Sequence, residues 1–390
     1  MKFTVSSKDL ARAIAMPVKA ASTKGISIPA LHCILITATA KTTDANLNVL
    51  AITGGDGKMA VTNTIAVIRD AEEGEEKACV DAKLFSDAVK ALPTQPITVA
   101  VDDKTATITY DGGEYTMPSC PVDEYPVMEE PTDAKTYAIA DISETIARAA
   151  AYAATGDTAA VRPVMNAVCT SLADDGTGGI SWEVCASDGR SLFVSGRGVG
   201  RGQSPSPILI PARVARMFTM FDTNVLTFTV GAGTTRVEGD GKNVTLRTVD
   251  SRYPNYHAVM PTAAPAATMD VKAQDIIPVI RRALTTAVEE TSCVVIRSFA
   301  GKTDIMAPDS AYGRSFHETL PAERVTADFE IGLNGQRLLD TMSMFTAWAR
   351  GDASVRLNFW SPKRAITITP LFTPDDEDTT VLQMPILIDQ

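Results

Sequence analysis

The chain has few of the residues that most often carry catalysis or metal binding. Its 390 residues include only three histidines, His32, His257 and His317, and six cysteines, with no Cys-x-x-Cys pair and no histidine at metal-ligand spacing. We therefore expect reduced, buried thiols, structural histidines and no cofactor. No apolar run reaches the roughly 20 residues of a membrane span, and the first residues lack an apolar signal core. These absences predict a cytoplasmic globular protein without a membrane partner.

In place of a catalytic motif, the sequence has a long internal repeat. An alternating strand pattern that leads to Tyr125-Pro126 returns far downstream before Tyr253-Pro254. This spacing exceeds any solenoid period, so it indicates three copies of a whole domain. The length suits three domains of common size, which we place at 1–132, 133–262 and 263–390.

The repeat includes helices as well as strands. Six segments have helical periodicity, and each follows a short apolar strand: 7–15, 81–89, 143–152, 211–218, 273–284 and 334–342. Alternating stretches broken by Gly, Asp and Asn, such as 98–110 and 355–369, indicate antiparallel hairpins with one buried face. The fold class is therefore predicted to be α+β, with two helices and antiparallel sheets in each domain.

Charge is distributed unevenly along the chain. The net charge of −11 argues against a polyanion ligand, but within the six helical segments basic residues outnumber acidic ones. Solvated outer faces would explain any one such helix. Because all six are alike, we favour a basic helical surface that attracts a polyanion, with the excess acid in loops such as 70–76 and 374–378. The acidic run at 375–378 is expected to be a solvated turn rather than a cation site.

No motif for nucleotide binding or catalysis is complete. Gly54 to Lys58 is similar to part of a phosphate loop, but Ile52 and Met59 stand where a glycine and a Ser or Thr are required. A hairpin turn explains this segment, and also Ser187-Asp188-Gly189-Arg190 in the second repeat. Two alternatives stay open: an enzyme on a triplicated scaffold with a phosphate site near Gly57-Lys58, and a peptide-binding scaffold without DNA.

The last ten residues, 381–390, are mostly apolar and contain Pro385. Because proline is excluded from central strands, we expect an edge strand that closes the last sheet. The same stretch is suited to hold apolar anchors of a partner peptide, since Met384 is flexible and adaptable.

An ordered set of motifs gives the chain a resemblance to a known family over its whole length. The motifs are Met1-Lys2-Phe3-Thr4-Val5, Pro29-Ala30-Leu31, Val161-Arg162-Pro163-Val164-Met165-Asn166, Ser187-Asp188-Gly189, Val249-Asp250-Ser251-Arg252-Tyr253-Pro254-Asn255-Tyr256 and Met384-Pro385. Together with the threefold repeat, they resemble the bacterial DNA polymerase III beta sliding clamp.

This resemblance implies a non-enzymatic head-to-tail homodimer that closes into a ring, with helices lining the hole and sheets outside. Such a ring would hold double-stranded DNA through its phosphates without reading bases, and would confer processivity on the replicative polymerase. Polymerase, clamp loader and repair proteins would bind through short linear peptides in a groove between the second and third domains.

The resemblance and the helical charge pattern together give two sets of candidate residues. The DNA-binding set is Lys8, Arg12, Lys24, Lys83, Lys90, Arg148, Arg213, Arg216, Lys272, Arg281 and Arg282. The partner-peptide groove set is Met165, Ser187, Gly189, Arg190, Leu192, Pro254, Val259, Asn334, Arg337, Lys363, Ala365, Leu382, Met384, Pro385, Ile386 and Leu387. The chain departs from the family at Asp188-Gly189-Arg190-Ser191-Leu192, at Pro163-Val164 and in its extended tail, Ile388-Asp389-Gln390.

Overall fold

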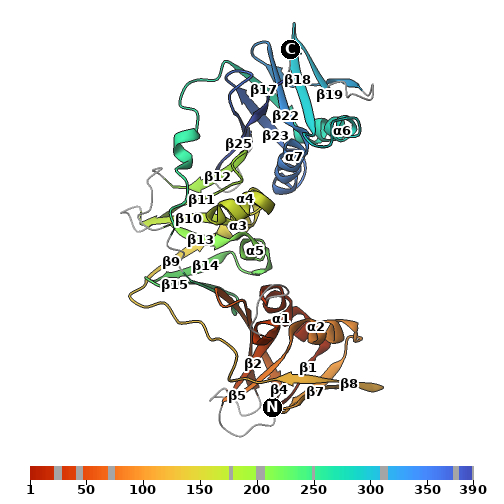
Figure 1. Cartoon of the computed structure of the whole chain (residues 1–390), viewed down its shortest axis with the longest axis vertical. Helices are drawn as coiled ribbons and strands as arrows, with labels where there is room; N and C mark the ends of the chain where they lie inside the picture. The colour runs from red at the N-terminus through yellow and green to blue at the C-terminus, as the bar shows by residue number, and fades with distance from the viewer. Residues whose placement is uncertain are drawn as a thin grey trace. The chain divides into compact units, whose positions relative to one another are not determined.

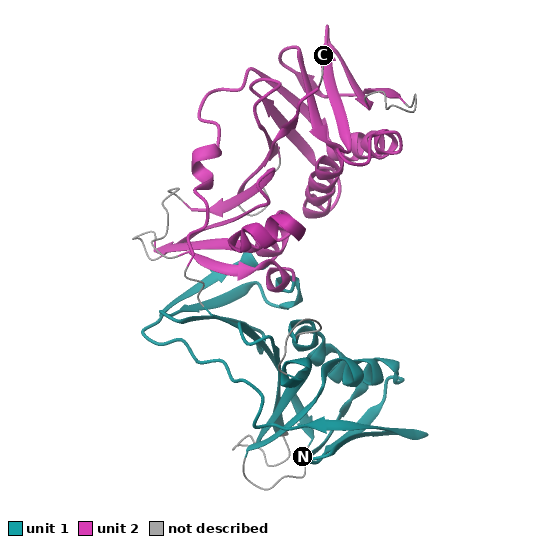
Figure 2. Cartoon of the chain, viewed as in Figure 1, with its two compact units in different colours: residues 1–143, 217–250 teal, residues 144–216, 251–390 magenta. Residues whose placement is uncertain are grey.

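A computed structural model describes residues 1–21, 29–40, 47–68, 75–174, 179–198, 207–247, 251–307, 315–371 and 377–388 (Figure 1). The chain divides into two compact units, residues 1–143 with 217–250 and residues 144–216 with 251–390 (Figure 2). Each unit combines helices with antiparallel sheets, which confirms the predicted α+β class. The three-domain division of the sequence stays a prediction, since the first unit takes in strands from the second predicted domain.

The first unit is built on one twelve-stranded sheet, in the order β1-β6-β7-β8-β5-β2-β3-β4-β16-β15-β14-β9. Its strands are β1 (Lys2–Ser6), β2 (Cys33–Ala40), β3 (Leu47–Gly55), β4 (Met59–Ile68), β5 (Glu75–Asp81), β6 (Pro96–Val101), β7 (Thr105–Tyr110), β8 (Gly113–Cys120), β9 (Lys135–Ala140), β14 (Val225–Val230), β15 (Thr234–Gly239) and β16 (Lys242–Arg247). Every pairing is antiparallel, including the β4–β16 ladder in which Val61 lies opposite Val244.

Two helices, α1 (Ser7–Ala20) and α2 (Ala82–Ala91), lie side by side against this sheet in Figure 1. Their apolar faces meet the alternating inner residues of the strands in one core, with Leu10, Ile14 and Phe85 fully buried. The side-chain amide of Asn63 donates a 3.0 Å hydrogen bond to the carbonyl oxygen of Ala13. A Cβ at Gly54 would lie 2.0 Å from the carbonyl oxygen of Pro17, so α1 can approach β3 only at a glycine.

The second unit contains a nine-stranded sheet, in the order β13-β10-β11-β12-β25-β24-β23-β17-β21, and a five-stranded sheet, in the order β20-β19-β18-β22-β26. Their strands are β10 (Ala167–Asp174), β11 (Ile180–Ser187), β12 (Ser191–Arg197), β13 (Ile208–Pro211), β17 (Ala267–Lys272), β18 (Cys293–Phe299), β19 (Lys302–Ala307), β20 (Phe316–Leu320), β21 (Arg324–Val325), β22 (Phe329–Asn334), β23 (Ser354–Phe359), β24 (Ile366–Pro370), β25 (Asp378–Gln383) and β26 (Pro385–Ile386). Its helices are α4 (Gly156–Val161), α5 (Ala212–Ala215), α6 (Ala273–Leu284) and α7 (Gly335–Ala349), and α3 (Ile142–Ala149) spans the division between the units.

All six predicted helices form, each directly after a strand as the repeat requires. Two of them begin with a side-chain cap: Asp81 accepts a 2.7 Å hydrogen bond from the amide of Leu84, and Asn334 accepts one of 2.9 Å from the amide of Arg337. The segment predicted at 211–218 is shorter than expected, since α5 ends at Ala215 and a 3-10 turn follows at Phe218–Met220. The helix α4 was not predicted; it contains no buried residue and so lacks an apolar stripe in the sequence.

Two expectations for the last part of the chain, the terminal strand and the acidic run before it, are corrected by the structure. Pro385 and Ile386 form β26 at the edge of the five-stranded sheet, as predicted, but Val381 to Gln383 belong to β25, between β12 and β24. The prediction of a solvated acidic turn is wrong for Glu377, whose side chain is 3% exposed and accepts hydrogen bonds from three groups. Asp375 and Asp376 lie outside the described residues.

Within the described ranges, no helix is both long enough and apolar enough to cross a membrane. The same residues contain no group of three or more His, Cys, Asp or Glu side chains placed to hold a metal ion.

Candidate functional site

The second unit has an apolar floor on one face of its nine-stranded sheet. Leu209, Cys169, Cys185 and Val194 lie opposite one another across β13, β10, β11 and β12, and the pair Leu192 and Leu382 follows in the next row. Side chains two residues apart on a strand share a face, which is why these residues collect there. We call the buried residues Ala167, Cys169, Cys185, Leu192, Leu209 and Leu382 the apolar floor.

Residues 251–266, which we call the connector, run over this floor. Tyr253, Tyr256 and Met260 pack against it. The hydroxyl of Tyr253 accepts a 2.9 Å hydrogen bond from the amide of Ser187, and the hydroxyl of Tyr256 donates one to Glu183. Burial raises the pKa of both tyrosines well above the usual range, so both hydroxyl groups stay protonated.

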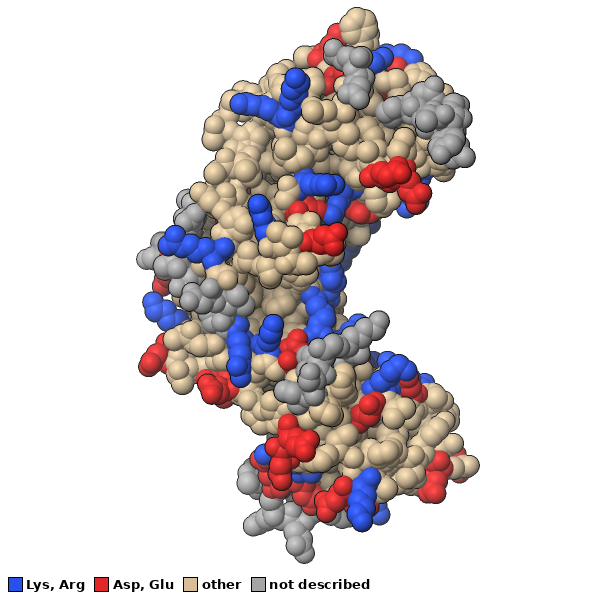
Figure 3. Space-filling model, viewed as in Figure 1, with Lys and Arg blue, Asp and Glu red and all other residues tan. Residues whose placement is uncertain are grey.

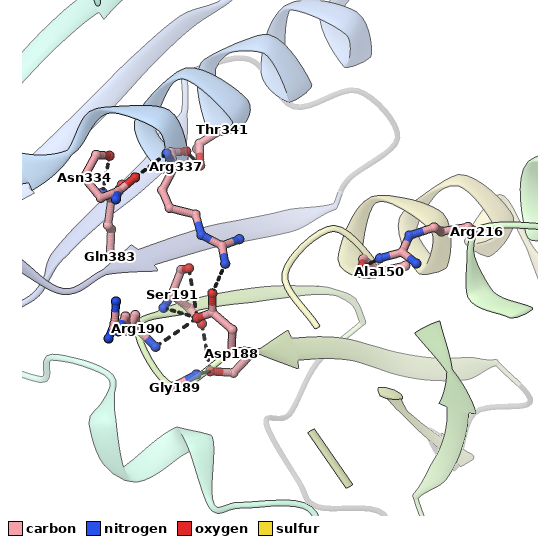
Figure 4. A network of polar contacts seen from close by, with 11 residues as sticks. Ala150, Asp188, Gly189, Arg190, Ser191, Arg216, Asn334, Arg337, Thr341 and Gln383 are labelled. Carbon is pink, nitrogen blue, oxygen red and sulfur yellow. Dashed lines mark hydrogen bonds and ion pairs between the residues drawn. The ribbon is translucent and has the colours of Figure 1, made fainter. Parts of the chain in front are cut away.

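The turn between β11 and β12 is fixed by Asp188, as Figure 4 shows. One oxygen of its carboxylate, Oδ1, accepts hydrogen bonds of 2.9 and 2.7 Å from the amides of Arg190 and Ser191. The other oxygen, Oδ2, forms an ion pair with Arg337 at the start of α7. Gly189 has a φ of +86°, a backbone conformation that favours glycine. This turn and α7 are thus held together by a mostly buried carboxylate.

The end of β25 joins the same network. The side-chain amide of Gln383 donates a 2.9 Å hydrogen bond to the carbonyl oxygen of Asn334 (Figure 4). The amide of Met384 donates one of 2.8 Å to the carbonyl oxygen of Arg190. Pro385 and Ile386 then pair with Leu333 and Gly332 on β22. The chain end is therefore anchored on both sides of the floor.

The groove residues predicted from the sequence separate into three groups by burial. Met165, Leu192 and Leu382 are buried, with exposed fractions of 2 to 4%. Ser187, Asn334, Arg337, Ala365, Pro385 and Ile386 are half-buried, and Gly189, Arg190, Pro254, Val259, Lys363, Met384 and Leu387 are exposed. The predicted set therefore has a buried part and an exposed part, and we call the exposed residues the rim. Of the predicted set, Leu192 and Leu382 belong to the apolar floor, and Ala365 packs against it.

Several residues of this site were absent from the predicted set. They are Glu183, Asp188, Tyr253, Tyr256, Met260 and Gln383. The resemblance supplied two of the floor residues, Leu192 and Leu382, and the Tyr253-Pro254 motif lies in the connector. The hydrogen bonds and ion pairs of the site join segments that are far apart in the chain, so no local pattern indicated them.

The predicted DNA-binding residues differ in how far they are engaged within the chain. Lys8, Arg12, Lys90 and Arg281 are exposed, and among the described residues none of them has a hydrogen-bond or ion-pair partner. Figure 3 shows Lys and Arg interspersed with Asp and Glu on one face of both units. Arg213 is also exposed, Lys272 is half-buried, and Lys24 lies outside the described residues.

Other members of the same set have partners inside the chain. Lys83 pairs with Asp87 at 2.9 Å, Arg282 with Glu318 and Arg148 with Glu377, and Arg216 donates to the carbonyl oxygen of Ala150. Arg148 is the most enclosed, with a side chain 12% exposed and its guanidinium 4.3 Å from the ring of Trp348. The Arg148 guanidinium is thus already neutralised by a buried carboxylate.

The segment that is similar to a phosphate loop is a hairpin turn. Gly57 has a φ of +82°, and Asp56 accepts hydrogen bonds of 2.9 and 3.1 Å from the amides of Lys58 and Met59. A phosphate loop needs such amides to point at the ligand. Here a carboxylate already occupies them, so the geometry gives no support to a phosphate site.

Comparison with known proteins gives consistent similarities. Residues 1–129 match the model of the DNA polymerase III beta subunit, N-terminal domain. The chain is 25% identical to the beta sliding clamp of Streptomyces coelicolor over 293 residues, 73% of this chain and 75% of the relative. It is 23% identical to that of Bacillus subtilis over 99% of both chains. The crystal structure of a sliding clamp, DNA polymerase III subunit beta, from Bartonella birtlesii bound to griselimycin aligns over 100% of both chains with a TM-score of 0.83 and 16% identity.

The fold is therefore that of the sliding clamps, over the whole chain. The chain is similar to the beta sliding clamps, the DNA polymerase III beta subunits, over its whole length. This confirms the family predicted from the sequence, and the comparisons do not favour the alternative of an enzyme on a triplicated scaffold.

Proposed function

We propose that this protein is a DNA sliding clamp: a cytoplasmic, non-enzymatic processivity factor for the replicative polymerase. Two copies would close head to tail into a ring of six similar domains around duplex DNA. Similarity to the beta sliding clamps over the whole chain is the observation that carries this proposal. The predicted threefold repeat supports it, because near-sixfold symmetry suits a polyanion with no preferred face.

DNA would be held through its phosphates by the exposed cations of the helices. Lys8, Arg12, Lys90 and Arg281 are the best candidates, since among described residues they have no competing partner. Arg213, Arg216, Lys83, Lys272, Lys24 and Arg282 stay in the proposed set, with weaker contributions expected where a carboxylate lies close. Contacts to phosphates alone carry no sequence information, so the ring would be free to slide.

The joints of the ring would form between sheet edges of the two copies. Strand β8 pairs with β5 only at Cys120 and Ser119, so most of its outer edge lacks a neighbouring strand within the described residues. Strand β20 is the edge of the five-stranded sheet. Edge strands present unpaired amide and carbonyl groups that can pair with another chain. Tyr115 on β8, which is 39% exposed and stacks on Tyr110, would add apolar area to this joint.

Partner proteins would bind through short linear peptides on the apolar floor and its rim. A peptide would place apolar side chains over Leu192 and Leu382, between the connector and the exposed side chain of Met384. Polymerase, clamp loader and repair proteins are the proposed partners. Griselimycin, present in the Bartonella birtlesii clamp structure, is the probe that we propose for this groove.

The ring is tested by retention on DNA of different topology. The protein is loaded on nicked circular DNA with a bacterial clamp loader, and its retention during gel filtration is compared with that on the same DNA after linearisation. We expect retention on the circle, rapid loss from the linear form, and a dimer by native mass spectrometry. A monomer at micromolar concentration, together with no difference between the two DNAs, would refute the ring.

A further inference from the structure

The connector does not pack closely on the sheet along its whole length. A cavity of about 250 Å³ lies between them, lined by Glu183, Val194, Arg197, His257, Met260 and Asp378, among others. Close packing fixes the position of a segment only where its atoms meet partners. Next to this cavity, polar contacts must therefore help to hold the connector.

A single carboxylate supplies that hold. Oε1 of Glu183 on β11 accepts the hydroxyl hydrogen of Tyr256 and lies 3.1 Å from Nε2 of His257. The side chains of Glu183 and His257 are 20% and 25% exposed, so water competes little for these bonds. The rings of Tyr256 and His257 are 4.3 Å apart, which keeps the two donors beside each other.

The segment that Glu183 holds carries part of the rim of the groove. Pro254 and Val259, two exposed members of the predicted set, lie on either side of Tyr256 and His257 in the connector. The residue before Pro254 anchors the connector again, because the Tyr253 hydroxyl accepts a hydrogen bond from the amide of Ser187 beside the Asp188 turn. Displacement of Tyr256 would therefore move both rim residues relative to the floor.

We propose that Glu183 is a positioning residue for the partner-peptide groove. It holds the connector through Tyr256 and His257, and so presets the distance between the rim and the floor before a peptide arrives. This inference rests on the proposed function. Its physical basis is preorganisation: a rim that is already in place loses less conformational entropy when the ligand binds.

The test compares Glu183→Ala with Glu183→Gln in the full-length dimer, with Glu330→Ala as the matched control. Glu330 is a half-exposed glutamate of the same unit whose partner is Arg297. Two quantities are measured: hydrogen exchange of the amides at 253–260, and the Kd of griselimycin by calorimetry. We expect Glu183→Ala to speed exchange and weaken binding about tenfold, because the hydrogen bond from Tyr256 and the polar contact with His257 are lost.

Glu183→Gln keeps one acceptor oxygen, so it should restore most of the affinity. Tyr256→Phe should weaken binding in the wild-type background but add little to Glu183→Ala, since both changes break the same tie. If Glu183→Ala does not fold, the Gln and Phe variants carry the same comparison.

The inference and the proposed function fail in different ways. If the wild type binds griselimycin and Glu183→Ala changes neither exchange nor Kd, the positioning role is overturned and the clamp function stands. If the wild type does not bind griselimycin, the proposed groove fails, and faster connector exchange in Glu183→Ala would still support the structural hold. Equal effects of Glu183→Ala and Glu330→Ala would also overturn the inference.

Discussion

The guanidinium group of Arg148 donates a 2.7 Å hydrogen bond to the carboxylate of Glu377, and the two side chains are 12% and 3% exposed. Thr145 and Ser195 also donate to this carboxylate. The ring of Trp348 on α7 covers the guanidinium. One ion pair thus connects α3, β12, the start of β25 and α7, elements from the second and third predicted domains.

Breaking this ion pair should be costly. Arg148→Ala leaves the Glu377 carboxylate buried without its charged partner, for which we expect a loss of about 3–5 kcal/mol in the free energy of unfolding. Urea denaturation of the purified protein measures it. Lys83→Ala is the control, because its pair with Asp87 is exposed to water and should contribute little to stability. Similar losses in the two variants would contradict the buried network.

The neighbouring arginines of α6 should differ in their contribution to DNA binding. Arg281 has no partner among the described residues, whereas Arg282 donates to both carboxylate oxygens of Glu318. Arg281→Ala should lower the slope of log K against log salt by about 1, as expected when one phosphate contact is lost. Arg282→Ala should change the slope less. The measurement is fluorescence anisotropy of labelled duplex at several salt concentrations; an equal slope for the wild type and Arg281→Ala would remove Arg281 from the interface.

Removal of residues 384–390 should separate partner binding from ring closure. The sheet ladder of β25 ends at Gln383, so the nine-stranded sheet keeps its pairings while Met384 and the β26 strand are lost. Griselimycin binding should fall below detection by calorimetry, with the dimer intact by native mass spectrometry. Unchanged affinity would refute the groove assignment.

A charge at the outer edge of β8 should weaken the dimer. Tyr115→Asp replaces exposed aromatic area by a carboxylate that would lose water at the proposed joint. We expect monomers at concentrations where the wild type is dimeric, measured by sedimentation velocity. Val225→Asp, at another exposed apolar residue of the same unit, should stay dimeric. A dimeric Tyr115→Asp would place the joint elsewhere.

The cysteines should react slowly with thiol reagents in the folded protein. Burial, with a smaller effect from Cys33, raises the pKa of Cys120 to about 12. Contact with Cys79, followed by burial, raises that of Cys33, and burial with contact to Cys169 raises that of Cys185. At pH 8 a thiol with a pKa of 12 is about one part in 10,000 thiolate, the reactive form. Ellman's reagent should react slowly with native protein and rapidly with all six cysteines in urea; fast native reaction would contradict burial.

Sequence periodicity could predict the fold because each helix follows a strand whose inner residues alternate. It located α6 to the residue, but it overestimated α5, since nothing local shows that the turn tightens at Phe218. For the site, the resemblance to the family supplied Leu192 and Leu382, and the apolar tail also indicated Met384. The burial of Glu377 and the hold of Glu183 on Tyr256 depend on partners more than 70 residues away in the chain, beyond the reach of local pattern.

Two strand ladders cross the predicted boundaries between repeats: β4 pairs with β16, and β12 pairs with β25. Bending at either place would leave backbone amide and carbonyl groups without hydrogen-bond partners, so neither boundary is a natural hinge. A closed ring has to open before circular DNA can enter. That opening would occur at the joints between copies, which separate by dissociation and not by unfolding. Both ladders would stay paired while the joints between copies separate and re-form.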